Sequence, residues 1–281
     1  MRAAAVMAAV ATACGCHGKG VLDPKGPVGK AELLLLMDAT AIMLAVIIPV
    51  ILLTLAFAWW FRAGNRKAIY LPEWQYSGRI EMIVWSIPLL IVVFLGGIAW
   101  VSAHNLDPAK KIDSSAMPLE VEVVSLDWKW LFIYPEQKIA LVNRLVLPVG
   151  RPVHFRLTSA TVMNSFFIPS LGSQIYTMPG MATQLNLQAD HPGTYEGLSA
   201  QFSGDGFSDM RFDAEAMMPD RFEAWAASSQ GMGGMLDEAN YSQLAKPGKY
   251  PGTKIYGKVM PGLFESIAFP DLRPVAMTHP E

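Results

Sequence analysis

Side chains that could bind a metal ion or act as nucleophiles are sparse in this sequence of 281 residues, which has two cysteines and five histidines. Beyond residue 100 the histidines stand singly, at His104, His154, His191 and His279. None of them has a second ligand at a spacing typical of a zinc or copper site. The sequence also lacks a nucleophile elbow, a phosphate-binding loop and a dinucleotide fingerprint. We therefore expect no catalytic centre and no metal site in this chain.

The two cysteines, Cys14 and Cys16, lie near the N-terminus behind a run of small apolar residues that follows Arg2. A basic residue, an apolar run and small residues in this order are typical of a secretory signal. We expect a lipoprotein-type signal peptide over residues 1–15 and acylation of Cys16, which follows Gly15. Cys14 is the alternative acylation site, and a disulfide or metal site made by the pair is another interpretation. An acyl chain would add membrane affinity.

The composition indicates a membrane protein. Hydrophobic residues make up 52% of the chain and charged residues only 16%, whereas soluble domains carry about 25% charged residues. The net charge of −2 and the lack of a Lys/Arg run give no reason to expect nucleic-acid binding.

Two stretches without a charged residue, 39–61 and 82–103, predict transmembrane helices. At about 1.5 Å per residue each is longer than the roughly 30 Å hydrocarbon core of a bilayer. Pro49 and Pro88 lie inside them, and neighbouring helices can satisfy the backbone groups that a proline leaves unbonded. Buried helices of a soluble protein are the alternative.

The segment between the two stretches, residues 62–81, indicates the orientation. It carries four basic residues, Arg62, Arg66, Lys67 and Arg79, against Glu73 within the segment and Glu81 at its end. An excess of Lys and Arg marks cytoplasmic loops. We therefore expect residues 16–38 and everything after residue 103 on the extracytoplasmic side, with 104–116 as a linker.

The segment 117–219 predicts a β-sandwich. Leu119, Val121 and Val123 alternate with glutamates, which is the pattern of strands with one buried face. The same alternation recurs at 153–157, 184–188 and 210–216, and turn residues at 148–150, 178–180 and 191–193 separate the runs. About 100 residues of short strands, which we expect to be antiparallel, are typical of a sandwich.

The segment 220–281 differs from the predicted sandwich. Residues 220–228 predict a short helix with Phe222 and Trp225 on one side. The remainder carries aromatic residues among prolines and glycines, so we expect an extension, irregular apart from the short helix, that packs on something larger. Partial disorder is the alternative.

Three segments resemble subunit II of the haem-copper terminal oxidases. Residues 126–136 read LDWKWLFIYPE, residues 162–172 (VMNSFFIPSLG) match the first copper-loop region of that family, and residues 193–210 match the second. The resemblance runs from about Leu22 to the tail. With DPKG at 23–26 and the aromatic extension, it is nearest to the cytochrome bo-type ubiquinol oxidases, bacterial proton-pumping complexes that pass electrons from ubiquinol to oxygen. It implies two transmembrane helices followed by a cupredoxin-like β-sandwich.

The resemblance also implies that copper has been lost. Copper-carrying relatives hold a dinuclear centre with two histidines, two cysteines, a glutamate carbonyl and a methionine. Aligned on the two loops, Asn164 and Phe207 stand at the histidine positions, and Ser199 and Ser203 at the cysteine positions. Gln201 stands at the glutamate position, and only the methionine, Met210, is retained. Soft thiolates hold such copper, and serine cannot replace them. We expect no copper, and we expect the remaining thioether to lie in the core.

The resemblance implies a non-redox structural and assembly subunit of a bacterial inner-membrane complex, with both termini outside the cytoplasm. The haems, the oxygen-reducing copper and the ubiquinol site are expected in partner subunit I, beside further small membrane subunits and membrane lipid. No cofactor is expected in this chain. Ubiquinol is lipid-soluble and reaches subunit I from within the bilayer, so an external copper relay is not needed.

Two further positions take an interpretation from the resemblance. At the position of Glu81, relatives carry a glutamate that faces the entrance of a proton pathway in subunit I, the one named for a lysine. The resemblance therefore makes Glu81 a proton-pathway candidate. The alternative is a carboxylate that stabilises a helix N-terminus or pairs with Arg79. Trp128 aligns with the family's electron-entry tryptophan, and without copper we expect it to serve in packing.

Two other functions stay open at this point. One is a cytochrome c oxidase subunit II with an altered copper site. The other is a non-enzymatic, cupredoxin-like membrane lipoprotein.

Overall fold

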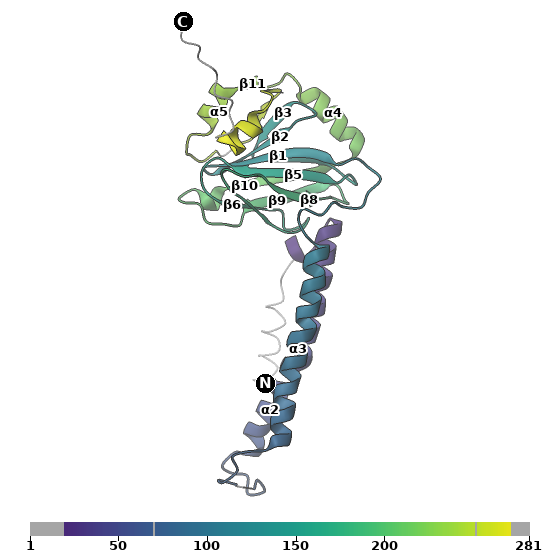
Figure 1. The fold of residues 1–281 in the computed structure, drawn as a ribbon, viewed down its shortest axis with the longest axis vertical. Coiled ribbons are helices and arrows are strands. Elements are labelled where there is room, and N and C mark those ends of the chain that lie inside the picture. Colours follow the sequence, from purple (N-terminus) through teal and green to yellow (C-terminus); the bar gives the residue numbers. More distant parts are fainter. Residues whose placement is uncertain (1–19, 70, 251, 271–281) are drawn as a thin grey trace, which may run out of the picture. The chain divides into compact units, whose positions relative to one another are not determined.

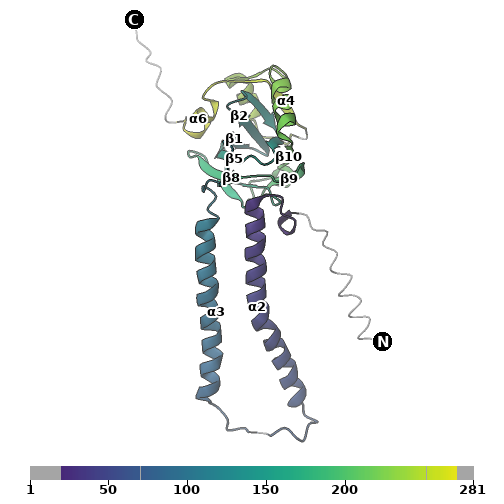
Figure 2. The same cartoon turned by 90° about the vertical axis from the view of Figure 1, so that its right-hand side faces the viewer.

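The computed structural model describes residues 20–69, 71–250 and 252–270, shown as ribbons in Figures 1 and 2. The predicted signal peptide with Cys14 and Cys16 lies outside the described residues, and so does His279. Contacts divide the chain into two units. One combines Met1–Glu32 with Pro108–Glu281, and the other is Leu33–Asp107.

Two long helices account for most of the second unit. Helix α2 runs Pro27–Trp60 and α3 runs Gly78–Asn105, and both are long and apolar enough to cross a membrane. Helix α2 begins well before the uncharged stretch 39–61 and α3 extends past both ends of 82–103, because charged residues such as Lys30 and Asp38 limit burial in hydrocarbon but do not interrupt helical hydrogen bonds. The first residues of α2 belong to the first unit.

Both internal prolines, Pro49 in α2 and Pro88 in α3, are accommodated within a continuous helix. A proline removes one backbone hydrogen bond and crowds the preceding turn, which bends a helix. Figure 2 shows such a bend partway along α2.

The first unit is a β-sandwich of two main sheets (Figure 1). The first sheet has the order β12-β3-β2-β1-β5-β8 and the second has the order β4-β10-β9-β6-β7. The strands of the first sheet are β1 (Leu119–Leu126), β2 (Lys129–Tyr134), β3 (Ile139–Val142), β5 (Val153–Ser159), β8 (Thr183–Leu187) and β12 (Lys254–Tyr256). Those of the second are β4 (Arg144–Pro148), β6 (Asn164–Phe167), β7 (Ile175–Thr177), β9 (Gly193–Ser199) and β10 (Arg211–Met217). The predicted sandwich is confirmed.

The expectation of purely antiparallel pairing is wrong for two strand pairs. Strand β1 pairs in parallel with β5, with Leu119 opposite Val153, and β4 pairs in parallel with β10. Parallel neighbours need a long connection, and here the strands β2 to β4 connect β1 to β5 while the chain from β5 to β9 connects β4 to β10. The sheets are therefore mixed.

Aromatic side chains fill the space between the two sheets. Trp130 and Phe132 of β2 meet Phe166 of β6 and Phe212 of β10, all at most 3% exposed. The rings of Phe166 and Phe212 are stacked with their centroids 5.2 Å apart, and Trp130 contacts both edge-on. Aromatic contacts of this kind contribute about 0.5–1.5 kcal/mol each beyond the area that they bury.

The C-terminal extension packs on the sandwich: residues 219–229 contact the core between the sheets through Phe222, and the later residues cover the outer face of the first sheet, so the extension finds its partners within the chain. Its buried residues Leu236, Tyr256 and Phe264 form a second core with Leu131 and Ile133 of β2. Its elements are α4 (Pro219–Ser229), β11 (Met235–Leu236), α5 (Glu238–Leu244), β12, β13 (Lys258–Val259) and α6 (Leu263–Ala268). The described part of the extension is thus folded, in contrast to the alternative of disorder.

The chain between Gly20 and Glu32 also packs on the sandwich, and we call residues 20–32 the N-terminal clasp. It includes the short 3-10 helix η1 (Gly20–Leu22) and the first turns of α2. The clasp bonds to the β6–β7 loop, with the Lys25 amide donating to the Ser170 carbonyl over 2.6 Å and the Gly29 amide donating to the Leu171 carbonyl over 3.0 Å.

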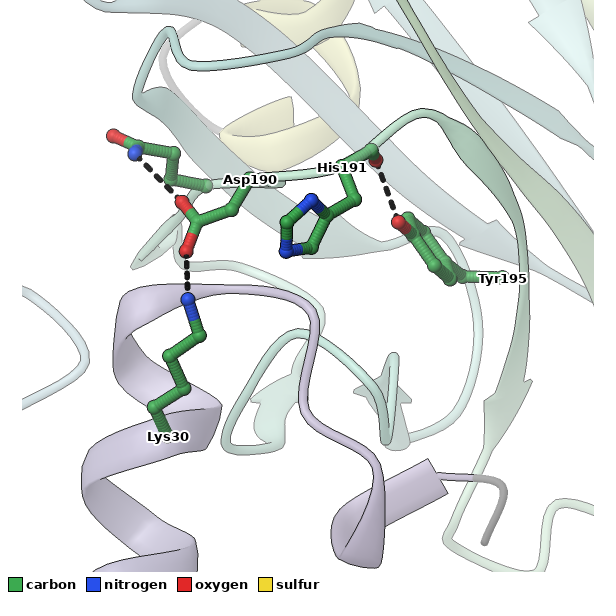
Figure 3. Close-up of polar contacts among 5 residues, drawn as sticks. Lys30, Asp190, His191 and Tyr195 are labelled. Atoms are coloured by element: carbon green, nitrogen blue, oxygen red, sulfur yellow. Dashed lines mark hydrogen bonds and ion pairs between the residues drawn. The ribbon is translucent and has the colours of Figure 1, made fainter.

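A second set of contacts joins the clasp to the β8–β9 turn (Figure 3). The Lys30 ammonium lies 2.6 Å from the carboxylate of Asp190, and the backbone amide of Asp190 donates to the Lys25 carbonyl over 2.7 Å. A Cβ atom at Gly26 would lie only 2.1 Å from the Gln188 carbonyl oxygen. Only glycine allows this approach.

Candidate functional site: the two loops that resemble a copper site

The positions that the resemblance aligns with copper ligands come together at one end of the second sheet. Asn164 opens β6, Ser199 closes β9, and Met210 precedes β10. Strands β6 and β9 are neighbours, with Phe166 opposite Ser199 in the register. The clasp contacts the opposite ends of these strands, at the β6–β7 loop and the β8–β9 turn.

Hydrogen bonds link three of these positions directly. The Ser199 hydroxyl lies 3.1 Å from the side-chain oxygen of Asn164 and 3.3 Å from the backbone carbonyl of Gln201. The Asn164 amide group donates to the Val162 carbonyl over 3.2 Å. Asn164 and Ser199 are almost fully buried. Buried polar groups must find partners, and here the Ser199 hydroxyl supplies one for the side-chain oxygen of Asn164.

Trp128 holds the second of the two aligned loop regions, within residues 193–210, at Ser203. The indole N–H donates to the backbone carbonyl of Ser203 over 2.9 Å, and the ring packs so closely on Gly206 that a Cβ atom there would lie 2.4 Å from it. Trp128 has φ of +65°, in the left-handed region, in the turn between β1 and β2. The side-chain hydroxyl of Ser203 is buried without a hydrogen-bond partner among the described residues. Trp128 therefore fastens the loop by packing and by one hydrogen bond.

Phe207 and Met210 are apolar members of the same loop. Phe207 begins the 3-10 helix η2 (Phe207–Asp209), and its ring contacts Phe202 edge-on at 5.7 Å. Met210 is 1% exposed and belongs to the aromatic core between the sheets. Its thioether thus packs with hydrocarbon, as expected from the sequence.

The side chains at these positions do not fit a dinuclear copper centre. Such a centre needs two bridging thiolates and imidazole ligands, whereas Ser199 and Ser203 offer neutral hydroxyls, Asn164 an amide, and Phe207 only hydrocarbon. Among the residues that the structure describes, no group of three or more His, Cys, Asp or Glu side chains is placed to hold a metal ion.

The described histidines lie apart from these loops. His154 on β5 is 2.9 Å from the Asn186 side-chain oxygen, and His104 near the end of α3 contacts the Trp100 carbonyl. His191 lies in the β8–β9 turn beside the clasp, where its carbonyl accepts the hydroxyl proton of Tyr195 over 2.6 Å (Figure 3).

Glu81 lies in the first turn of α3 and is exposed in the chain as described. No ion pair joins it to Arg79 within the described residues, which leaves the pairing alternative without support. Its position suits a carboxylate that stabilises a helix N-terminus.

A cluster of ionisable residues that sequence reasoning missed lies on the outer face of the first sheet. Arg156 of β5 lies 3.1 Å from Glu122 of β1 and 2.8 Å from Glu265 of α6, with its guanidinium over the Phe264 ring. Burial raises the pKa of Glu122 to about 7; the nearby Glu265 adds to the rise and Arg156 opposes it. Both glutamates line a cavity of about 370 Å³. Glu265 lies 109 residues beyond Arg156 in the chain, so spacing could not reveal the cluster.

Comparison with known proteins agrees with this architecture. The family model for cytochrome c oxidase subunit II, periplasmic domain, matches residues 129–217. A ubiquinol oxidase subunit 2 from Acetobacter aceti is 51% identical over 249 residues, which cover 88% of this chain and 81% of that protein. A cytochrome bo(3) ubiquinol oxidase subunit 2 from Pseudomonas putida is 48% identical and covers 90% and 80% of the two chains.

Among solved structures, the periplasmic domain of subunit II of the cytochrome oxidase of Bradyrhizobium japonicum aligns with a TM-score of 0.39 and 20% identity, over 43% of this chain and 95% of that one. The extent and identity of the sequence matches are what define the relationship. The chain belongs to the subunit 2 family of the ubiquinol oxidases.

Proposed function

We propose that this chain is the non-redox, structural subunit 2 of a terminal oxidase that passes electrons from ubiquinol to oxygen. As a subunit it belongs to an oxidoreductase complex, in keeping with its relatives. Haems, the oxygen-reducing copper and the ubiquinol site lie in partner subunit I, and this chain supplies the extracytoplasmic domain.

The main support for this proposal is the set of side chains at the loop positions that align with copper ligands. The hydrogen bonds from Ser199 toward Asn164 and Gln201 stabilise the loops without a metal. The bond from Trp128 to Ser203 does the same for the second loop. The loops thus keep a defined shape while lacking the thiolates that an electron-carrying copper centre needs.

The proposal is tested by metal analysis of the purified full chain after copper loading and desalting. We expect no stoichiometric copper in the native chain. Five changes together, Asn164→His, Ser199→Cys, Gln201→Glu, Ser203→Cys and Phe207→His, should create an intensely coloured thiolate–copper site. A Ser208→Cys variant is the matched control for a single exposed thiol. Two coppers per native chain would overturn the proposal and favour an electron-carrying subunit.

We further propose that residues 62–81 face the cytoplasm and that the sandwich lies outside. The clasp bonds to the sandwich, so the chain ahead of α2 and the chain beyond α3 share one side of the membrane. The basic residues of the loop favour the cytoplasm for the other side. A label that cannot cross membranes should modify a cysteine introduced at Ser208 in intact spheroplasts and spare one introduced at Asn65. The reverse pattern would contradict this orientation.

The lipid anchor at Cys16 is part of the same proposal, because an acylated residue four positions ahead of Gly20 would hold the clasp near the membrane. Labelled fatty acid should be incorporated into the chain and should be lost in Cys16→Ser, whereas Cys14→Ser keeps it. Loss only in Cys14→Ser would assign the anchor to the other cysteine.

Glu81 is proposed to help protons enter subunit I. Glu81→Ala should slow ubiquinol oxidation without lowering the amount of assembled complex, while Glu81→Asp should keep more activity. Glu73→Ala, which removes a carboxylate from the neighbouring loop, is the matched control. Unchanged turnover in Glu81→Ala would leave the residue as a helix-end charge.

A further inference from the structure

The end of α2, the start of α3 and the loop between them line an open apolar cavity of about 680 Å³. Six residues line it: Phe57, Phe61, Ile69, Leu71, Trp74 and Ile80. They come from the end of α2, the loop itself and the start of α3, so the cavity lies where the chain leaves α2 and enters α3. Its volume is in the range of about 300–1,000 Å³ that is common for ligand sites.

The loop side chains of this cavity are large, apolar and mostly exposed in the chain as described. Ile69 is 75% exposed, Leu71 64% and Trp74 59%. Contiguous exposed apolar surface marks a site of contact with membrane or protein. Tryptophan also favours the headgroup level of a bilayer.

Four cations lie in the chain segments that flank the lining residues of this cavity. Arg62, Arg66, Lys67 and Arg79 all lie within the loop or the first residues of α3, and none forms an ion pair with a carboxylate of the described residues. The Arg62 guanidinium donates to the Trp59 carbonyl over 2.7 Å and lies over the Trp59 ring, which leaves the other three cations for a ligand.

The loop has a defined structure that can present these groups. The Asn65 side chain donates to the Trp60 carbonyl over 2.6 Å and accepts from the Lys67 amide over 3.1 Å. The Trp74 amide donates to the Leu71 carbonyl over 3.2 Å. These bonds end α2 and form turns at 65–67 and 71–74, which position the side chains of these two segments.

We propose that this cavity binds an anionic phospholipid, with an acyl chain among the apolar side chains and the phosphate held by Arg66, Lys67 and Arg79. An apolar cavity alone would accept any hydrocarbon. The three cations select a headgroup with net negative charge, since basic pockets between membrane helices bind such headgroups. The proposal does not depend on oxidase activity.

Native mass spectrometry of the purified full chain tests the proposal, with phosphatidylglycerol and phosphatidylcholine as the added lipids. We expect one phosphatidylglycerol retained per chain and no comparable retention of phosphatidylcholine. Each neutralised cation should weaken retention about fivefold, so a variant with Arg66→Gln, Lys67→Gln and Arg79→Gln should bind about a hundredfold more weakly. Lys110→Gln with Lys111→Gln is the control, because it removes charge just past the other end of α3, and it should bind as the native chain does.

A second readout follows the acyl chain. Phosphatidylglycerol with brominated acyl chains should quench Trp74, measured as the difference between the native chain and Trp74→Phe. Equal retention of the two lipids, unchanged binding in the triple variant, or no quenching of Trp74 would each overturn the proposal. Retention of no lipid, with the loop instead cross-linked to another subunit in the complex, would assign the cavity to a protein contact and overturn it as well.

Discussion

Glu122 makes a quantitative prediction about the pH dependence of stability. Its carboxyl binds a proton more tightly in the fold, where burial raises the pKa to about 7, than in the unfolded chain, where the ordinary value is 4.5. Between these two values the folded state therefore binds more protons than the unfolded state. Linkage then requires the free energy of unfolding to fall as the pH rises through this window and to level off above about pH 7.

The size of the effect follows from the same two values. A tenfold change in proton affinity corresponds to about 1.4 kcal/mol, so ionised Glu122 costs the fold at most about 3 kcal/mol. The side chain is 12% exposed and the adjoining cavity is partly open, so we take roughly half of this figure, about 1.5 kcal/mol. For a folded unit of this size, 1.5 kcal/mol corresponds to about 3–6 °C in Tm.

The perturbation is Glu122→Gln, which cannot ionise and leaves Arg156 paired with Glu265 at 2.8 Å. We expect the Tm of the native chain to fall by about 3–6 °C relative to the variant between pH 5 and pH 8. The assay is thermal unfolding of the detergent-purified full chain, followed by near-ultraviolet circular dichroism. Glu136→Gln is the control, because Glu136 is 52% exposed and lies 3.8 Å from its cationic partner. Parallel curves for Glu122→Gln and the native chain would refute the reasoning.

Three further changes test the clasp, the core and the second loop. Gly26→Ala should destabilise the chain by at least about 2 kcal/mol, because its Cβ would overlap the Gln188 carbonyl, whereas Gly64→Ala has open space and should be neutral in the same denaturation experiment. Phe212→Ala should cost about 3–5 kcal/mol by opening a cavity among stacked rings, and a loss below 1 kcal/mol would contradict the described core. Trp128→Phe should cost about 1 kcal/mol through the lost indole hydrogen bond and should speed proteolysis of the 200–210 loop; equal cleavage rates would show that the bond does not hold the loop.

The sequence predicted the strands that bury one face and missed those that bury both. In β1 the alternation of Leu119, Val121 and Val123 with half-buried glutamates is visible because the glutamates lie on a polar face. Every residue of β2 is buried, since Trp130 and Phe132 enter the core between the sheets while Leu131 and Ile133 lie under the extension. A strand covered on both faces reads as one apolar run without a period of two.

The candidate site was predictable only in part. The aligned loops gave the identity of each residue, but the bond from Ser199 to Asn164 joins residues 35 positions apart, and its geometry depends on the pairing of β6 with β9. The same limit applies to Glu122 and Glu265, because the fold brings these residues together and no local sequence pattern predicts their contact. The approach of Gly26 to Gln188 is a third case. The chain has 23 glycines, and the sequence does not indicate which of them lies in a close contact.

The N-terminal clasp has a consequence for how the protein is made. Both helices are an insertion within one folded unit, because the unit is built from residues up to 32 and from 108 onward. The clasp is synthesised first, but its partners, the β6–β7 loop and the β8–β9 turn, emerge more than 130 residues later. A chain that translocated only one of these two parts could not form the bond between Lys25 and Ser170. The clasp contacts thus require that both helices insert as a hairpin, since a chain in which only one helix crossed the membrane would separate Lys25 from the β6–β7 loop and leave that loop uncovered.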